Sequence, residues 1–308
     1  MKNYLIAGFL FLALPTFINA QEIIPLYPEG IKNHIQSDET EEQISDQILW
    51  ISKVQTPTLQ IYLPPKAASI HKAMIVLPGG GYEGLAYDWE GTEIAKWLNS
   101  NGIAAFVVKY RMPNSRSVET GRLAPLQDAQ RAIRTVRKNA GEWNIDPHQI
   151  GVIGFSAGGH LASTLGTKFD YNDERYFDDN SVDTVSARPD FMALIYPVIS
   201  MEASVTHMGS RNSLLGENPE EKMIGLYSNE LHVTDQTPPA FLVHSGDDDV
   251  VPIQNSLRFY EALQQHGIYA EMHIYPTGGH GYSLATTRGT EYLKTWPDRL
   301  IDWILSLP

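Results

Sequence analysis

The chain has 308 residues, of which 43% are hydrophobic, with 24 glycines, 19 prolines and no cysteine, a composition typical of a globular protein of one or two domains. Acidic residues outnumber basic ones by 36 to 23, and the net charge of -13 argues against nucleic acid as a partner. Without cysteine, thiol catalysis and thiolate metal sites are excluded, so any nucleophile has to be an oxygen.

The first twenty residues have the pattern of an export signal. Lys2 precedes an apolar run at residues 4–14, and the small residue Ala20 stands before the polar Gln21. We expect cleavage near Ala20 and export to the periplasm or beyond. The apolar run is short for a bilayer span and no cysteine follows it for lipid attachment, so no stable membrane anchor is expected; an uncleaved anchor is the alternative.

Residues 21–308 are expected to form one domain in which strands and helices alternate. Two short strand candidates, residues 48–54 and 58–63, come first and are expected to pair antiparallel at a sheet edge. Apolar runs of strand length follow at residues 73–77, 103–110, 150–154, 191–196, 240–244 and 270–275. Helical patterns lie between or after them, near residues 91–100, 124–140, 157–166, 254–266 and 294–306. This alternation predicts an α/β fold with a mostly parallel central sheet and helices on both faces.

The segment 197–239 follows the sixth of these strand candidates. It contains Pro, Gly and Ser punctuation and is too long for a plain connection. We expect a small, partly helical, cap-like insertion over one end of the sheet.

A candidate nucleophile follows the strand at residues 150–154. In such sheets the chemistry takes place at the carboxyl ends of the strands. The sequence there is Gly154-Phe155-Ser156-Ala157-Gly158, a G-x-S-x-G elbow, in which a tight strand-to-helix turn projects the serine hydroxyl from the sheet. An apolar strand before it and small helical residues after it support Ser156 as the nucleophile.

A serine nucleophile needs a base, and the base needs an orienting carboxylate, in the chain order Ser, acid, His. The loop after residues 240–244 carries Asp247, Asp248 and Asp249, of which only one can orient an imidazole. The loop after residues 270–275 carries His280 between two glycines, which indicates close approach by another group. His280 is therefore the predicted base, and the residues alone leave the choice among the aspartates open.

A glycine-rich turn, Pro78-Gly79-Gly80-Gly81-Tyr82, follows the strand at residues 73–77. Its amides, together with the amide of Ala157, are predicted to form an oxyanion hole. The turn also matches the dinucleotide fingerprint G-x-G-x-x-G. We reject that reading because the next helix is predicted to start near Gly91, too far away to bind a pyrophosphate.

No metal or cofactor is expected, because no two of the ten histidines have the four-residue spacing of a helical ligand pair. His160 and His244 are predicted to be structural, and Arg111 and Asp128 to form an ion pair that braces the sheet. Aromatic faces beside the site would suit a sugar ring, with ordinary loop packing as the alternative. The candidate substrate contacts are Tyr82 and Tyr282, with Tyr87 and Trp89 also near the site.

These segments resemble the α/β-hydrolase superfamily and, within it, secreted bacterial carbohydrate esterases of the acetylxylan-esterase-like and feruloyl-esterase-like (BD-FAE-like) group. The resemblance runs from about Ile24 to the carboxyl end. It implies Ser156 as nucleophile, His280 as base, Asp248 as acid, and the amides of Gly80, Gly81 and Ala157 as the oxyanion hole. Pro78 departs from the pattern, since many relatives have histidine there. The blocks that carry the resemblance are LPGGGYEGLAYDWEG (77–91), KYRMP (109–113), the stretch 124–163 around GFSAGG, HSGDDDVVPIQNSLRFYEAL (244–263) and HIYPTGGHGYSL (273–284).

The resemblance implies a cofactor-free serine esterase that removes acyl groups, above all acetyl, from plant cell-wall polysaccharide such as xylan through an acyl-enzyme. A feruloyl or general short-chain carboxylesterase is the alternative. A serine peptidase of the same fold would need a gating domain, for which we see no segment, and a catalytically dead relative would have lost a triad residue. The expected partner is an acetylated carbohydrate, and the sequence does not indicate an oligomeric state.

Overall fold

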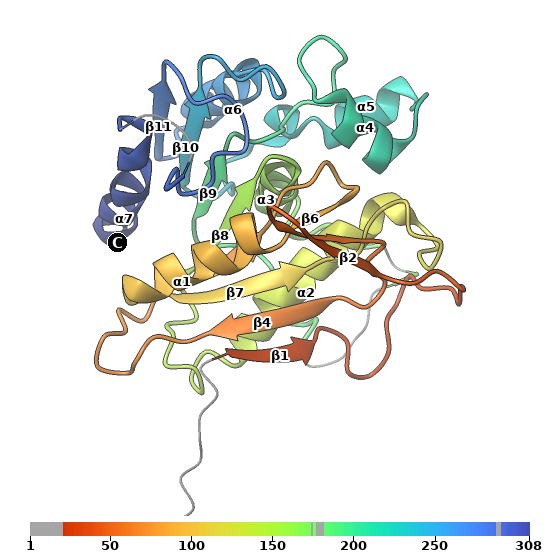
Figure 1. Ribbon diagram of the computed structural model, residues 1–308, viewed down its shortest axis with the longest axis horizontal. Helices are drawn as coiled ribbons and strands as arrows, with labels where there is room; N and C mark the ends of the chain where they lie inside the picture. Colours follow the sequence, from red (N-terminus) through yellow and green to blue (C-terminus); the bar gives the residue numbers. More distant parts are fainter. Residues whose placement is uncertain (1–20, 174, 177–181, 288–290) are drawn as a thin grey trace, which may run out of the picture.

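The structure is a computed structural model that describes residues 21–173, 175–176, 182–287 and 291–308. Its main sheet has eight strands in the order β1-β4-β7-β5-β8-β9-β10-β11 (Figure 1). The predicted export signal at residues 1–20 lies outside these described residues. Neighbouring strands from β7 to β11 pair in parallel, whereas β4 runs antiparallel to both β1 and β7. The predicted α/β fold with a mostly parallel sheet is therefore confirmed. The strands are β1 (Gln21–Pro25), β4 (Thr58–Tyr62), β5 (Ala73–Leu77), β7 (Ala104–Lys109), β8 (Ile150–Phe155), β9 (Met192–Ile195), β10 (Ala240–Ser245) and β11 (Ala270–Tyr275).

Helices cover the sheet on both faces, as Figure 1 shows with α1 in front of the sheet and α2 behind it. The central strands β5, β8, β9 and β10 are buried along their whole length, which is why they read as continuous apolar runs. On one face α1 and α7 meet through Trp97 and Trp296, whose ring centroids are 6.0 Å apart. The main helices are α1 (Glu93–Ser100), α2 (Ala124–Lys138), α3 (Ala157–Thr167), α6 (Gln254–Gln265) and α7 (Trp296–Ser306).

The predicted edge pair of residues 48–54 and 58–63 is wrong. Strand β4 pairs with β1, and β3 (Leu49–Ser52) belongs to a second sheet with β2 (Glu42–Ser45) and β6 (Gly84–Ala86). The reason is packing: Ile51 of β3 is buried opposite Leu85 of β6, and the indole of Trp50 covers Gly84, where any Cβ would clash with it. We refer to β2, β3 and β6 as the small sheet.

The segment 197–239 connects β9 to β10 and contains α4 (Met208–Leu215), α5 (Glu221–Tyr227) and the 3-10 turn η3 (Asn229–His232). The predicted ion pair of Arg111 and Asp128 is present and buried, with Nη2 to Oδ1 at 2.8 Å. None of the described helices has the length and apolar character needed to cross a membrane.

Candidate active site

Ser156 sits on the turn between β8 and α3 in a conformation that side chains rarely adopt, with φ 51° and ψ -118°. Such backbone strain costs about 1–3 kcal/mol and is typical of functional positions. The glycines of the elbow make the turn possible, because a Cβ on Gly154 would lie 2.1 Å from the Gly158 carbonyl oxygen and one on Gly158 would lie 2.2 Å from that of Leu77. The elbow therefore holds the Ser156 hydroxyl at the carboxyl end of β8.

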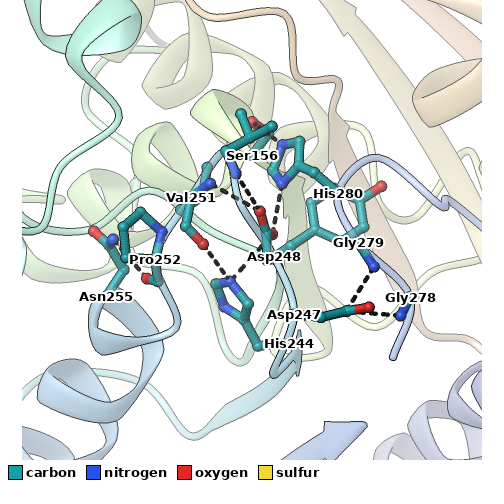
Figure 2. A network of polar contacts seen from close by, with 12 residues as sticks. Ser156, His244, Asp247, Asp248, Val251, Pro252, Asn255, Gly278, Gly279 and His280 are labelled. Carbon is teal, nitrogen blue, oxygen red and sulfur yellow. Dashed lines mark hydrogen bonds and ion pairs between the residues drawn. The ribbon is translucent and has the colours of Figure 1, made fainter. Parts of the chain in front are cut away.

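Three loops bring Ser156, His280 and Asp248 into one hydrogen-bonded relay (Figure 2). His280 Nε2 lies 2.9 Å from Ser156 Oγ, and His280 Nδ1 lies 2.7 Å from Asp248 Oδ2. An ionised carboxylate can only accept hydrogen bonds, so Nδ1 carries the ring proton and Nε2 is free to accept the serine proton. This is the arrangement that a serine nucleophile requires.

Asp248 is held by more than its contact with His280. Its Oδ1 accepts hydrogen bonds from the amides of Val250 and Val251, at 3.0 and 2.8 Å. The buried His244 lies 3.3 Å from Oδ2 through its Nε2. Burial pushes the pKa of Asp248 upward, but the hydrogen bonds from His244 and His280 outweigh this and hold the pKa well below the usual range of a carboxyl group. Asp248 is therefore ionised at neutral pH.

The neighbouring aspartates have different surroundings. Asp247 Oδ1 accepts hydrogen bonds from the amides of Gly278 and Gly279, both at 2.9 Å, and so ties down the loop that carries His280. Asp249 is exposed. Of the three aspartates, Asp248 is the one that the structure brings to the imidazole.

The glycine loop (residues 78–82) lies beside Ser156 and turns through left-handed backbone. The φ angles are 138° at Gly80, 64° at Gly81 and 61° at Tyr82. Gly80 and Gly81 line the cleft in front of Ser156, and no hydrogen-bond acceptor for their amides is found among the described residues. Ala157 is the first residue of α3, so its amide has no acceptor within the helix either. These free donors are what an oxyanion hole needs.

A cleft of about 320 Å³ opens above the relay. Its walls come from distant parts of the chain: Trp89 and Glu90, the turn of the small sheet at Gln47, and His207 from the segment 197–239. His207 caps α4, because its Nδ1 accepts the amide hydrogen of Ser210, and burial lowers its pKa. The imidazole is therefore neutral, with its proton on Nε2. Within the part of the chain that the structure describes, no cluster of His, Asp or Glu is suited to holding a metal ion.

The prediction that Tyr82 and Tyr282 contact the substrate is wrong. Both side chains are buried, and neither lines the cleft. The Tyr82 hydroxyl lies 2.8 Å from His160 Nδ1. Tyr282 packs edge-on against Tyr196, with ring centroids 4.5 Å apart. Among the aromatic candidates, Trp89 is the one in the cleft wall.

His160 and His244 are buried beneath the site, as expected of structural residues. His160 Nε2 contacts the carbonyl oxygen of Tyr227 at 2.8 Å, and burial lowers the pKa of His160 to about 4. His244 Nε2 lies 2.9 Å from the carbonyl oxygen of Val251, and Figure 2 shows Asp248 between His244 below and His280 above. His160 is therefore uncharged at neutral pH.

The sequence analysis missed Glu90, a carboxyl group that is 4% exposed and forms part of the cleft wall. Its Oε2 accepts a hydrogen bond from the Gly79 amide at 2.8 Å, and its Oε1 accepts one from the Tyr196 hydroxyl at 2.7 Å. Burial raises the pKa of Glu90, while these two hydrogen bonds and the charge of His280 partly offset that effect. An acidic residue ahead of a predicted helix is typical of a solvated helix start, so its residue type and position did not indicate a buried role.

Comparison with known proteins points to one family. A family model described as BD-FAE matches residues 59–263, about two thirds of the chain. An acetylxylan esterase of Xylanibacter ruminicola is 37% identical over 77% of this chain and 46% of its own length. An endo-1,4-beta-xylanase B of Butyrivibrio fibrisolvens is 36% identical over 76% of this chain and 36% of its own length. The chain thus spans less than half the length of either of these curated relatives.

A solved structure resembles the chain along nearly its whole length. It is an acetyl ester-xyloside bifunctional hydrolase from Caldicellulosiruptor lactoaceticus, with 42% identity and a TM-score of 0.76. The match covers 92% of this chain and 96% of that one.

Proposed function

The chain belongs to the BD-FAE family of carboxylic ester hydrolases, and on that premise we propose that it removes acetyl groups from plant cell-wall polysaccharide such as xylan, with Ser156, His280 and Asp248 as its catalytic triad. One observation carries the proposal: the relay of 2.9 Å from Ser156 Oγ to His280 Nε2 and 2.7 Å from His280 Nδ1 to Asp248 Oδ2 opens into the cleft. The names of the relatives, an acetylxylan esterase and an acetyl ester-xyloside hydrolase, support the acetylated carbohydrate as substrate.

The first half of the reaction follows from the hydrogen-bond directions. His280 Nε2 takes the proton of Ser156 as the serine oxygen attacks the ester carbonyl carbon. Asp248 fixes the tautomer of His280 and stabilises the imidazolium that forms. The amides of Gly80, Gly81 and Ala157 donate to the oxyanion, and each such donor contributes about 3–4 kcal/mol to transition-state stabilisation.

In the second half, the imidazolium gives its proton to the sugar oxygen, the sugar leaves, and the acetyl group stays on Ser156. His280 then takes a proton from water, whose oxygen attacks the acetyl carbon; the bond from that carbon to Ser156 Oγ breaks, the imidazolium returns its proton to Ser156 Oγ, and acetate is released. No group beyond these residues and water is required. The export pattern at residues 1–20 supports action outside the cytoplasm, where polymeric xylan is accessible.

The test compares Ser156→Ala with wild type on acetylated xylan and on 4-nitrophenyl acetate. Loss of the nucleophile should lower kcat by at least about 10³-fold on both substrates. Ser100→Ala, at the end of α1 and outside the cleft lining, is the matched control and should retain wild-type turnover. Turnover by Ser156→Ala within tenfold of wild type would overturn the triad. A panel of acetyl, feruloyl and longer acyl esters on xylan and on 4-nitrophenol tests the substrate class, and preference for feruloyl esters would overturn the acetyl assignment.

A further inference from the structure

A π-helical turn, η1 (Asp88–Thr92), lies between the small sheet and α1, closed by a 3.0 Å hydrogen bond from the Thr92 amide to the Tyr87 carbonyl oxygen. Such turns are rare and are found preferentially at functional sites. Successive residues of this turn contact different parts of the protein. Asp88 Oδ1 accepts a hydrogen bond from the Leu49 amide of the small sheet at 2.8 Å, and the Trp89 indole donates to the Gly281 carbonyl oxygen at 2.9 Å. The third, Glu90, points into the site.

The Glu90 carboxyl group receives donors from two sides. The Gly79 amide donates to Oε2 and the Tyr196 hydroxyl donates to Oε1. The direction of the second bond is fixed, because the Tyr196 oxygen itself accepts the Ser283 amide hydrogen at 3.0 Å and so turns its own hydrogen toward Glu90. All partners are donors, and an acceptor-only carboxylate is the group that satisfies them.

These bonds join the two loops that the proposed mechanism uses. Gly79 belongs to the glycine loop, directly before Gly80 and Gly81, which line the cleft. Ser283 belongs to the loop that carries His280, which we call the histidine loop (residues 276–284). The Tyr196 ring also packs against the imidazole of His280, with centroids 4.9 Å apart and planes at 63°. The buried Glu90 carboxylate therefore links the glycine loop to the histidine loop through the Tyr196 hydroxyl.

We propose that Glu90, as a carboxylate, is a positioning residue that holds the glycine loop and the histidine loop in register and stabilises the protonated form of His280. The inference rests on the proposed function, since it assigns Glu90 a part in the same site. Displacing reacting groups by about 1 Å can cost about 10²-fold in rate, so a side chain that sets two loops relative to each other has a large effect on kcat. Its negative charge adds a second carboxylate to Asp248 near the imidazolium.

The test is Glu90→Gln, which keeps the shape, removes the charge and turns an amide NH2 toward one of the two donors. We expect kcat to fall about 10–100-fold with KM changed less than threefold. Because a negative charge is lost near His280, the acid limb of the kcat/KM profile should move to lower pH. The matched control is Glu93→Gln, which makes the same change three residues further along the chain. Among the described residues, the Glu93 carboxyl group has no hydrogen bond to either loop. This variant should keep the wild-type kcat and pH profile.

Tyr196→Phe separates position from charge. It removes the hydroxyl that bridges Glu90 and Ser283 but keeps the Glu90 carboxyl group, so kcat should fall, and the acid limb should move less than it does in Glu90→Gln. NMR titration of the His280 imidazole reads the same charge effect without turnover and therefore stays informative if the substrate assignment, or the esterase activity itself, is wrong. A Glu90→Gln protein with wild-type kcat, or with an unmoved His280 titration, overturns the proposal. If Glu90→Gln does not fold, Glu90→Asp takes its place: the charge stays but no longer reaches both partners, and a wild-type kcat for that variant overturns the proposal equally.

Discussion

Changing each of the three consecutive aspartates to asparagine provides a test of the triad acid that contains its own controls. Each variant loses one negative charge close to His280 and keeps the size of the side chain. Long-range electrostatic effects are therefore similar in the three proteins, and differences in kcat report the local contacts. Asp248 contacts His280 Nδ1 at 2.7 Å, Asp247 accepts two loop amides at 2.9 Å, and Asp249 is exposed.

The expected losses follow from those contacts. In Asp248→Asn the negative charge is lost, and an amide NH2 facing His280 Nδ1 favours the tautomer with its proton on Nε2. That tautomer cannot take the serine proton, and disruption of this kind costs about 10⁴-fold in kcat. In Asp247→Asn the amide oxygen still accepts hydrogen bonds from the Gly278 and Gly279 amides, but these bonds no longer involve a charged acceptor. The loss is about 1 kcal/mol in total at this exposed position, so kcat should fall less than tenfold. Asp249→Asn should stay within about twofold of wild type.

The assay is release of 4-nitrophenol from its acetate under saturating conditions, with thermal unfolding measured in parallel to show that each variant is folded. A loss at Asp247 or Asp249 larger than that at Asp248 would contradict the reasoning, because it would mean that another carboxylate orients His280. The same conclusion would follow if Asp248→Asn kept more than a tenth of the wild-type kcat.

Two further predictions concern stability. Gly80→Ala places a Cβ 2.2 Å from the Gly84 carbonyl oxygen at a φ of 138°, so urea denaturation should show a free energy of unfolding lower by about 2–4 kcal/mol. Gly141→Ala, which has open space around it, should leave this free energy nearly unchanged, and equal urea midpoints for the two variants would contradict the reasoning. His160 has a folded-state pKa of about 4 against 6.5 for the free group, so the unfolded chain binds its proton first as the pH falls. Stability should therefore be fully present above pH 6.5 and decline by up to about 3 kcal/mol toward pH 4. His160→Gln should flatten this part of the pH dependence of the urea midpoint, and an unchanged slope would refute the assignment.

The parts of the fold that the sequence predicted correctly are those specified by local pattern. Strands such as β5 and β8 are buried on both faces and therefore read as continuous apolar runs. The elbow around Ser156 is equally recognisable, because its glycines lie within two residues of the serine, although the contacts that require Gly158 come from Leu77 and Pro78. The positions of His280 and the aspartates followed from the rule that loops at the carboxyl ends of parallel strands share one edge of the sheet.

The small sheet was missed because its pairing depends on residues far apart in the sequence. Strand β2 is short, polar and exposed along its length, so neither periodicity nor apolar content marks it. Strand β6 has three residues, and its partner β3 lies more than thirty residues earlier. The register is set by the indole of Trp50 over Gly84, a contact that neither residue indicates alone.

Side-chain direction at a turn is the second kind of information that the sequence lacked. Tyr82 and Trp89 are both aromatic residues near the glycine loop, yet Tyr82 is buried on His160 and Trp89 lines the cleft. Tyr82 has a left-handed φ of 61°, which residues other than glycine rarely adopt and which its residue type does not indicate. The choice of Asp248 over its neighbours has the same origin, because consecutive residues of one turn point to different partners.

In the proposed function, chemistry and substrate selection are carried by different parts of this fold. The relay of Ser156, His280 and Asp248 stands on loops at the ends of β8, β10 and β11, which are anchored in the sheet and therefore hold their geometry. The cleft walls come from the small sheet and from the segment 197–239, which contributes His207. Substitutions in those walls can change the size and polarity of the cleft without altering any distance in the relay. Relatives that share the triad and differ in the small sheet or in the 197–239 segment should therefore differ in their preferred ester, whereas the interactions around Glu90, which connect the relay to the glycine loop, should be the same in all of them.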